Sequence, residues 1–353
     1  MPSPKRFPSM PIAAAIVVFA GASPAYAQKL IFSPTTTAIT VGHAAHSSLP
    51  KYMKCWEKEG IDVDVVGIQG ATAGMQQIAA KNVTFANLGP EVLMMARAKG
   101  AKVKSVYTYS RSTIYRAVAL KSSGITKTED LRGKTMGAIA MSTGAVPYGR
   151  QMLQAAKIDP DKDVKWLAIG EGAQAMLALK RGDADAWFAW DTAVAQLQAA
   201  GADLVQFNPP YFDDLIGNVI VVHEDFLAAN KATVAKALRC IAQSTIYGLT
   251  NPEKTIRVHW QQYPATKPEG DEKIAMEKAL LVFESRFSGY STPKGVKWGE
   301  NLESQWRGVA KLMQAENLLP ADFDVTASYT NELIDEINKF DAAAVVAAAK
   351  ADK

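Results

Sequence analysis

One ten-residue segment, Gly-Asp-Ala-Asp-Ala-Trp-Phe-Ala-Trp-Asp at positions 182–191, places strong limits on how this chain can fold. A helical pattern ends just before it at Arg181-Gly182, since glycine readily adopts the left-handed turn that closes a helix. The mostly apolar residues 186–190 then predict a short buried strand. A new helical pattern follows at once, with Asp191 or Thr192 able to cap it. The sequence therefore predicts an aromatic ring and a carboxylate at the carboxyl end of a strand, where open α/β sheets bind small ligands.

The same pattern occurs a second time, upstream. Residues 75–106 align with residues 176–207 without a gap, although few positions are identical. The alignment places the strand pattern 85–88 on 186–189, and Gly-Pro-Glu at 89–91 on Trp190, Asp191 and Thr192. Two interpretations remain open. The first is that the similarity is generic, because any two strand–helix units look alike. The second is that the chain forms two similar lobes, each of which contributes a strand-end loop to a shared cleft.

The order of patterns along the chain predicts an α/β fold with two lobes. Strand patterns at 30–42, 61–66, 83–88 and 103–109 alternate with helical ones, which indicates a largely parallel sheet with helices on its faces. The alternation restarts at Lys134, and a strand pattern at 219–222 can return the chain to the first lobe. Helical patterns fill the remainder of the chain.

These patterns give four predicted segments and a hinge. The segments are a signal peptide (1–27), the first part of lobe 1 (28–115), an inserted lobe 2 (116–218), and the completion of lobe 1 with C-terminal helices (219–353). Two crossing segments, at 110–115 and near Gly217, would form the hinge on which such lobes open and close.

The N-terminal segment has the features of a secretory leader. Lys5-Arg6 is a positive start, residues 11–22 are a short apolar run, and Ala25-Tyr26-Ala27 is a small-residue cleavage site. We expect cleavage after Ala27 and a secreted mature protein that starts at Gln28, with a retained membrane anchor as the alternative. The apolar run is shorter than a bilayer span requires.

Composition excludes some functions and leaves the cysteines open. Hydrophobic residues make up 48% and charged residues 21% of the 353 residues, as in ordinary globular proteins. The net charge of +4 includes two leader residues and predicts no nucleic-acid partner. Cys55 and Cys240 lack any metal-binding or redox spacing. Two unpaired buried thiols are favoured, and a long-range disulfide in an oxidising compartment is the alternative.

No catalytic, metal or cofactor motif stands out. The chain has no GxSxG, HExxH or P-loop sequence, and His43 and His46 have no third ligand nearby. Residues 170–175 read GxGxxA, with Asp191 about 20 residues further on, which matches a dinucleotide fingerprint. A secreted protein meets no ordinary nicotinamide pool, and the loop 69–74 is equally rich in glycine and alanine. We therefore expect no cofactor, no metal and no enzyme activity.

The candidate ligand-binding residues lie in loops that each lead from a strand into a helix. Hydroxyl groups and free N–H groups at helix starts suit an anion, and Ser142-Thr143-Gly144 is the best such site, although it could be a plain cap. Trp190 could stack on a ligand or pack in the core, and Arg111 could bind an anion or face solvent. Asp191 could accept from a ligand ammonium group or cap its helix. The full set is His46, Ser47, Ser48, Gly70, Ala71, Gly89, Pro90, Glu91, Tyr109, Arg111, Ser142, Thr143, Gly144, Ala145, Trp190 and Asp191.

Several of these segments resemble a known family. The chain resembles the periplasmic solute-binding proteins of ABC transporters of the sulfonate, taurine and nitrate type, a family shared with binders of thiamine-pyrimidine precursors. The resemblance covers nearly all of the mature chain. It is carried by residues 49–63, 69–74, 123–134, 182–191 and 329–340.

The resemblance implies a two-lobed periplasmic binding protein of type II, or Venus-flytrap, architecture with mixed, mostly parallel sheets. Such a protein captures a small organic anion and delivers it to an inner-membrane permease with its ATPase, as a monomer. The loops at 46–48 and 142–145 would contact the ligand, and Asp191 matches the residue that meets the amine in taurine binders. Two alternatives remain: a binder of a neutral heteroaromatic molecule, and a secreted enzyme of the same architecture.

Overall fold

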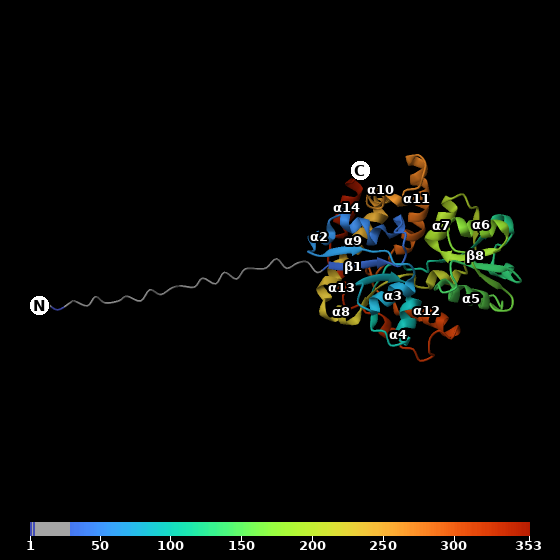
Figure 1. Cartoon of the computed structure of the whole chain (residues 1–353), viewed down its shortest axis with the longest axis horizontal. Coiled ribbons are helices and arrows are strands. Elements are labelled where there is room, and N and C mark those ends of the chain that lie inside the picture. Colours follow the sequence, from blue (N-terminus) through green and yellow to red (C-terminus); the bar gives the residue numbers. More distant parts are fainter. Residues whose placement is uncertain (2, 4–28) are drawn as a thin grey trace.

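The computed structural model describes residues 29–353 together with Met1 and Ser3, so the expected signal peptide lies outside the described residues. Two lobes are visible, each built on a five-stranded sheet flanked by helices (Figure 1). The first sheet has the order β2-β1-β3-β10-β4, from β1 (Lys29–Pro34), β2 (Asp62–Val65), β3 (Phe85–Leu88), β4 (Val103–Thr108) and β10 (Val219–His223). The second has the order β7-β6-β8-β5-β9, from β5 (Tyr115–Leu120), β6 (Thr135–Ala138), β7 (Lys165–Ala168), β8 (Ala186–Trp190) and β9 (Leu204–Gln206).

The helices follow the same division. Those that precede β10 are η1 (Val41–His46), α1 (Ser48–Tyr52), α2 (Cys55–Lys58), α3 (Ala71–Ala79), α4 (Pro90–Ala98), η2 (Lys121–Ser123), η3 (Thr128–Leu131), α5 (Ala145–Ala155), α6 (Ala173–Arg181), α7 (Asp191–Ala199) and η4 (Pro210–Asp214). Those that follow it are α8 (Glu224–Ala229), α9 (Lys231–Thr250), α10 (Pro252–Gln262), η5 (Pro264–Thr266), α11 (Glu272–Phe287), η6 (Ser288–Tyr290), α12 (Glu303–Ala315), η7 (Val325–Ser328), α13 (Ile334–Ile337) and α14 (Ala342–Ala351). In residues 29–353, no helix has the length and apolar character that crossing a bilayer requires.

The two-lobed α/β fold is confirmed, but its sheets are more mixed than the strand order alone implied. In the first sheet β1 pairs in parallel with β2 and β3, whereas β10 runs antiparallel to both β3 and β4. The strand that returns from the second lobe therefore lies between β3 and β4. The second sheet has the same arrangement, with β5 between β8 and β9.

The internal alignment corresponds to a structural repeat. It places α3 on α6, β3 on β8, α4 on α7 and β4 on β9. In both sheets the third strand of the order is the aligned one, β3 or β8, and the fifth is β4 or β9. The weak echo in the sequence therefore marks two similarly built lobes rather than a chance likeness of two strand–helix units.

The first helical segment differs from the prediction of one helix after a loop. Residues 41–46 form η1, and α1 already begins at Ser48. Lys54, with a left-handed φ of 51°, separates α1 from α2. The residues expected in an open loop, His46 to Ser48, are therefore fully buried.

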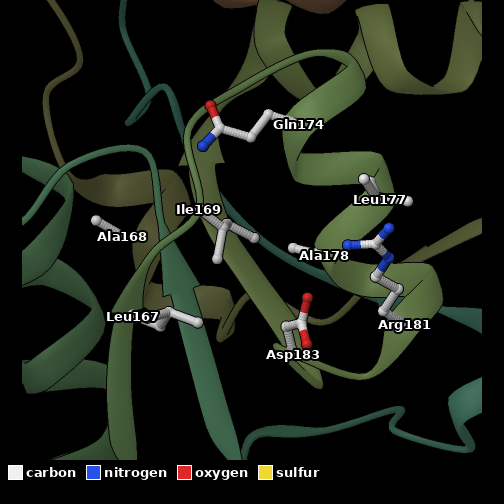
Figure 2. Close-up of a pocket in the computed structure, with 8 residues that line it drawn as sticks. All are labelled: Leu167, Ala168, Ile169, Gln174, Leu177, Ala178, Arg181 and Asp183. Atoms are coloured by element: carbon white, nitrogen blue, oxygen red, sulfur yellow. The ribbon is translucent and has the colours of Figure 1, made fainter.

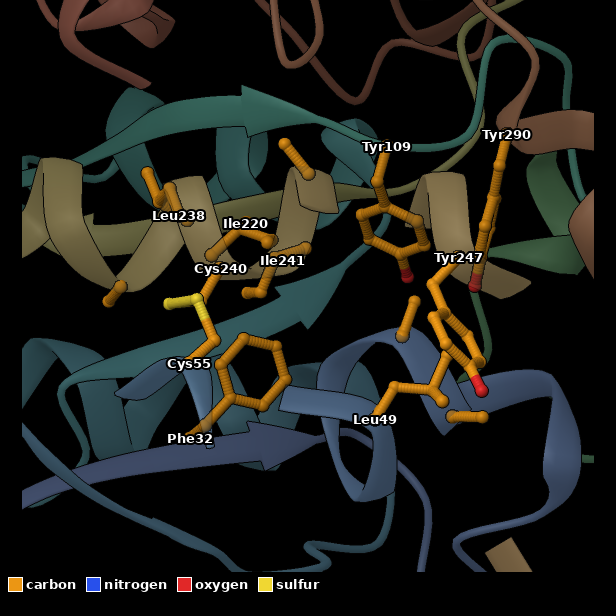
Figure 3. Packing of buried hydrophobic residues seen from close by; sticks show 14 of the residues in the cluster. Phe32, Leu49, Cys55, Tyr109, Ile220, Leu238, Cys240, Ile241, Tyr247 and Tyr290 are labelled. Atoms are coloured by element: carbon orange, nitrogen blue, oxygen red, sulfur yellow. A yellow bond between two sulfur atoms is a disulfide. The ribbon is translucent and has the colours of Figure 1, made fainter. Parts of the chain in front are cut away.

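Cys55 and Cys240 form a disulfide, so the preference for two free thiols is wrong. The bond joins α2 to α9 over a sequence separation of 185 residues, with the two Cα atoms 5.6 Å apart. Figure 3 shows it within the core of the first lobe, beside Phe32 and Leu238. Packing of α9 against α2 brings the two cysteines together, and no local sequence pattern reports that contact.

Removal of this bond should lower stability. We expect the double variant Cys55→Ala, Cys240→Ala to lose about 2–4 kcal/mol of unfolding free energy, since a cross-link restricts the unfolded chain. Urea unfolding with and without reductant measures the change. Reductant should destabilise the wild type and leave the double variant unchanged. Equal midpoints for oxidised wild type and the variant would contradict the expectation.

Two crossing segments connect the lobes and lie side by side. The Ser110 N–H donates to the Asn218 carbonyl (3.2 Å), and the Gly217 N–H donates to the Ser110 carbonyl (2.9 Å). A Cβ at Gly217 would lie 2.2 Å from the Ser112 carbonyl oxygen, so only glycine permits this approach. Two C-terminal helices also bridge the lobes: α11 packs on α7, and α12 packs on α4 and α5 (Figure 1).

Candidate functional site

A cavity of about 550 Å³ lies between the two lobes, within the usual size range of small-molecule sites. Loops and helix starts at the strand ends of both sheets line it, and α11 adds one side chain. The first lobe contributes Thr35, Thr36, Thr37, Ala38, Thr40, His43, Gln69, Gly70, Ala71, Thr72, Ala73, Gln76, Asn87, Gly89 and Val92. The second lobe and the connecting segments contribute Ile114, Tyr115, Ile139, Ala140, Ser142, Thr143, Gly144, Glu171, Trp190, Thr192, Gln196, Asn218 and Arg286.

Part of the candidate set lines this cavity. Its members there are Gly70, Ala71, Gly89, Ser142, Thr143, Gly144 and Trp190. They come from both lobes, and each lies where a strand end or loop leads into a helix. For these seven residues, the pattern of strand ends leading into helices predicted a common location.

The candidates at 46–48 lie instead in the interior of the first lobe. His46 packs between Phe32 and Tyr109, with ring centroids 5.7 and 4.4 Å away, and burial lowers its pKa to about 3. Ser48 Oγ is 2.9 Å from His259 Nδ1, and Ser47 Oγ donates to a backbone carbonyl. The 3-10 helix η1 turns His43, which was not a candidate, toward the cavity.

Tyr109 and Arg111 have partners within the protein. The Tyr109 ring lies 5.3 Å from that of Tyr290 in the aromatic cluster of the first lobe (Figure 3). The Arg111 guanidinium donates to the backbone carbonyls of Glu300 and Lys297, so it ties a crossing segment to the C-terminal region. Neither side chain lines the cavity.

Asp191 forms a buried ion pair with Arg286, which joins α7 of the second lobe to α11. Arg286 Nε donates to both carboxylate oxygens, at 2.9 and 3.0 Å, and each residue has only 4% of its side chain exposed. The Thr192 N–H also donates to Asp191 Oδ1 (2.6 Å). The carboxylate therefore neutralises Arg286 and accepts from the adjacent N–H, but it makes no capping bond to α7, whose N-cap is Trp190. It does not line the cavity, where the sequence placed it.

Glu91, Pro90 and Ala145 are buried behind the cavity wall. Glu91 belongs to α4 of the first lobe, yet its carboxylate accepts hydrogen bonds from two tyrosines of the second. The Tyr115 hydroxyl donates at 2.8 Å and the Tyr148 hydroxyl at 3.5 Å. Burial raises the pKa of Glu91, against the opposing effect of these donors.

The charge of the cavity is nearly balanced. Within the described residues, the ionisable groups at its wall, apart from Tyr115, are His43, Glu171 and Arg286. Burial and the nearby Arg286 lower the pKa of His43 well below its usual value, so its ring is neutral at pH 7. Since Arg286 is paired with Asp191, the wall offers a ligand no unpaired cation in this part of the chain.

Several polar residues at the cavity gave no signal in the sequence. Asn87 accepts a hydrogen bond from the Thr35 N–H through Oδ1, while its buried Nδ2 has no partner in the described structure. Arg286 lies in a long helical stretch where an arginine predicts a solvated face. Tyr115 is the first residue of β5, the first strand of the second lobe. Its position at the end of a crossing segment could have indicated that it lies near the cavity.

A second hollow, of about 420 Å³, lies within the second lobe alone. Figure 2 shows it between the end of β7 and α6, lined by Leu167, Leu177 and Arg181 among others. It receives nothing from the first lobe. No group of three or more metal-ligating side chains occurs in the described chain at either place.

A comparison with solved structures identifies the fold. The periplasmic aliphatic sulphonate binding protein SsuA from Escherichia coli superposes with a TM-score of 0.67, at 16% identity. The superposition covers 85% of this chain and 91% of that protein. The chain therefore has the fold of the periplasmic binding proteins.

Sequence comparison gives the family. The formylaminopyrimidine-binding protein of Halalkalibacterium halodurans is 24% identical over 268 residues, which are 74% of this chain and 78% of that protein. The 4-amino-5-hydroxymethyl-2-methylpyrimidine phosphate synthase of Aspergillus parasiticus is 23% identical over 319 residues, 84% of this chain and 86% of that protein. A family model described as NMT1/THI5 like matches residues 55–255, more than half of the sequence. The chain belongs to the NMT1/THI5-like family.

Proposed function

We propose that this protein is the substrate-binding component of an ABC importer. The observation that carries the proposal is the cavity, which residues of both lobes line. The two crossing segments beside it would act as the hinge on which the lobes open and close. The protein closes on one small molecule there and delivers it to an inner-membrane permease with its ATPase. It acts in the periplasm as a monomer, with the hinge at 110–115 and near Gly217.

Binding rather than catalysis is the role that the relatives favour. A family member is named as a binding protein, and so is the sulphonate-binding structural neighbour, whereas another relative is named as a synthase. A binding protein releases its ligand unchanged. Mass spectrometry of a ligand recovered after incubation with the protein distinguishes the two roles, because a new product would show catalysis.

The cavity favours the neutral heteroaromatic ligand over the small organic anion. Among the described wall residues the one side-chain cation, Arg286, is held by Asp191, so an anion would be left with uncharged donors alone. A flat ring instead meets the aromatic faces of Trp190 and Tyr115. Asn87 also lines the cavity, and its buried Nδ2, which has no partner in the described structure, could donate to a ring nitrogen or carbonyl after a small side-chain rotation. The name of the formylaminopyrimidine-binding relative agrees with this chemistry.

A thermal-shift screen tests the proposal. The mature protein is measured with pyrimidines, aromatic and aliphatic carboxylates, sulfonates, taurine and nitrate. A ligand at 100 times its dissociation constant adds about 2.7 kcal/mol of stability, which raises the melting temperature measurably. We expect a heteroaromatic compound to give the shift. A shift with sulfonates alone would contradict the ligand class, and no shift with any compound would contradict the binding role.

Trp190 should contribute to the affinity of that ligand. The variant Trp190→Ala removes one aromatic ring from the cavity wall, and we expect its affinity to fall about 5- to 150-fold, since stacking contributes about 1–3 kcal/mol per ring. Calorimetric titration with the compound found in the screen measures the change. Trp190→Phe keeps a ring and should retain most of the affinity. Equal affinities for wild type and Trp190→Ala would contradict the placement of the ligand.

A further inference from the structure

We propose that Glu91 is a specificity-determining residue, whose buried negative charge excludes anions from the start of α5 and selects uncharged ligands. The proposal rests on the binding function above and adds the residue that sets the ligand's charge. The sequence pattern singled out Ser142-Thr143-Gly144, at the start of α5, as the best anion site. The structure places a carboxylate of the protein against that same position.

Glu91 belongs to the first lobe, but its carboxylate contacts residues of the second lobe. The residue lies in the first turn of α4 and is 1% exposed. Its hydrogen-bond donors, the hydroxyls of Tyr115 and Tyr148, belong to β5 and α5 of the second lobe. Both donors are uncharged. Their hydrogen bonds favour the ionised carboxylate, against the effect of burial, and add no positive charge that would cancel it.

Two glycines separate this carboxylate from the cavity. A Cβ at Gly144 would lie 2.1 Å from Glu91 Oε1, and a Cβ at Gly89 would lie at the same distance. Both glycines line the cavity and precede helices, α5 and α4 respectively. The carboxylate is therefore immediately behind the wall, and a side chain at either position would displace it.

The position of Glu91 determines what the helix starts can bind. The positive ends of the α4 and α5 dipoles both lie next to the carboxylate. The negative charge of Glu91 therefore offsets the positive potential that would otherwise attract a ligand anion. A sulfonate at Ser142 to Gly144 would lie next to a like charge, and residues 29–353 place no unpaired cation at the wall to offset the repulsion. An uncharged ring meets no such repulsion.

The experiment compares the selectivity of two variants with that of the wild type. Glu91→Gln keeps the shape and an acceptor for Tyr115 but removes the charge, whereas Tyr148→Phe removes a hydrogen bond and keeps the charge. Calorimetric titration of each protein uses 4-aminopyrimidine as the neutral probe and benzenesulfonate as the anionic one. Glu129→Gln, at an exposed position, controls for the change in net charge.

We expect Glu91→Gln to raise the affinity for benzenesulfonate at least tenfold and to change that for 4-aminopyrimidine less than threefold. Tyr148→Phe and Glu129→Gln should leave the ratio of the two affinities as in the wild type. An unchanged ratio in Glu91→Gln, in a wild type that binds the neutral probe, would overturn the role of Glu91 while the binding function stands. Wild-type protein that binds benzenesulfonate as tightly as 4-aminopyrimidine would overturn it as well.

Discussion

Lowering the pH from 7 to 5 is expected to remove about 5–6 kcal/mol from the unfolding free energy, or about 2 kcal/mol for each of three histidines that are buried in the neutral form. Burial lowers the pKa of His259 to about 4, and burial together with Arg286 lowers that of His46 to about 3. The pKa of His43 is lowered well below its usual value, first by burial and then by Arg286.

The direction of this effect follows from proton uptake. Below about pH 6.5 the histidines of the unfolded chain take up protons, while those of the folded protein stay neutral until about pH 4 or lower. The unfolded state therefore binds more protons in this window, and stability falls as the pH falls. Urea unfolding at pH 7, 6 and 5 measures the slope. A stability that stays constant over this range would show that the histidines take up protons in the folded protein.

His46 allows the contribution of one ring to be isolated. Neither of its ring nitrogens has a hydrogen-bond partner in the described structure, and aromatic rings surround it. The variant His46→Phe should gain about 1–2 kcal/mol at pH 7, since two unsatisfied polar atoms leave the core. It should also lose about a third less stability between pH 7 and 5, because one of three titrating groups is gone. An unchanged pH slope would contradict the assignment.

Breaking the ion pair between Asp191 and Arg286 is expected to cost about 3–5 kcal/mol of stability. The variant Arg286→Met fills a similar volume but leaves the Asp191 carboxylate buried without its cation. Because the pair joins α7 to α11, the loss also weakens the contact between the second lobe and the C-terminal helices. Urea unfolding of the ligand-free protein at pH 7 measures the cost.

A double-mutant cycle separates the pair from its surroundings. The double variant Asp191→Asn, Arg286→Met removes both charges, and we expect it to be more stable than Arg286→Met alone. That order follows because a buried unpaired charge is more costly than a buried neutral group that can hydrogen-bond. If the double variant were the less stable of the two, the cost would come from lost packing rather than from the unpaired carboxylate.

Local features of the fold could be predicted from the sequence, whereas long-range ones could not. The bounds of β8 agree with the predicted 186–190, since the Arg-Gly signal before it ends the preceding helix and a short apolar run follows. The insertion of β10 between β3 and β4 depends on contacts between distant parts of the chain. So does the disulfide, whose cysteines are 185 residues apart.

The candidate site shows the same limit. Strand ends that lead into helices predicted residues such as Gly70, Ser142 and Trp190, which do line the cavity. The inference for His46 assumed an open loop, but small and apolar neighbours allowed residues 41–46 to form a buried 3-10 turn. Arg286 could not be predicted, because its role depends on Asp191, which lies in the other lobe.

The insertion of one lobe into the other also sets the order in which the sheets can be completed. A chain that emerges N-terminus first has all strands of the second sheet once Gln206 is out, whereas the first sheet still lacks β10. The disulfide of Cys55 can form only later, after Cys240 in α9 has emerged. The second lobe can therefore fold while the first is still an incomplete sheet with an unpaired thiol.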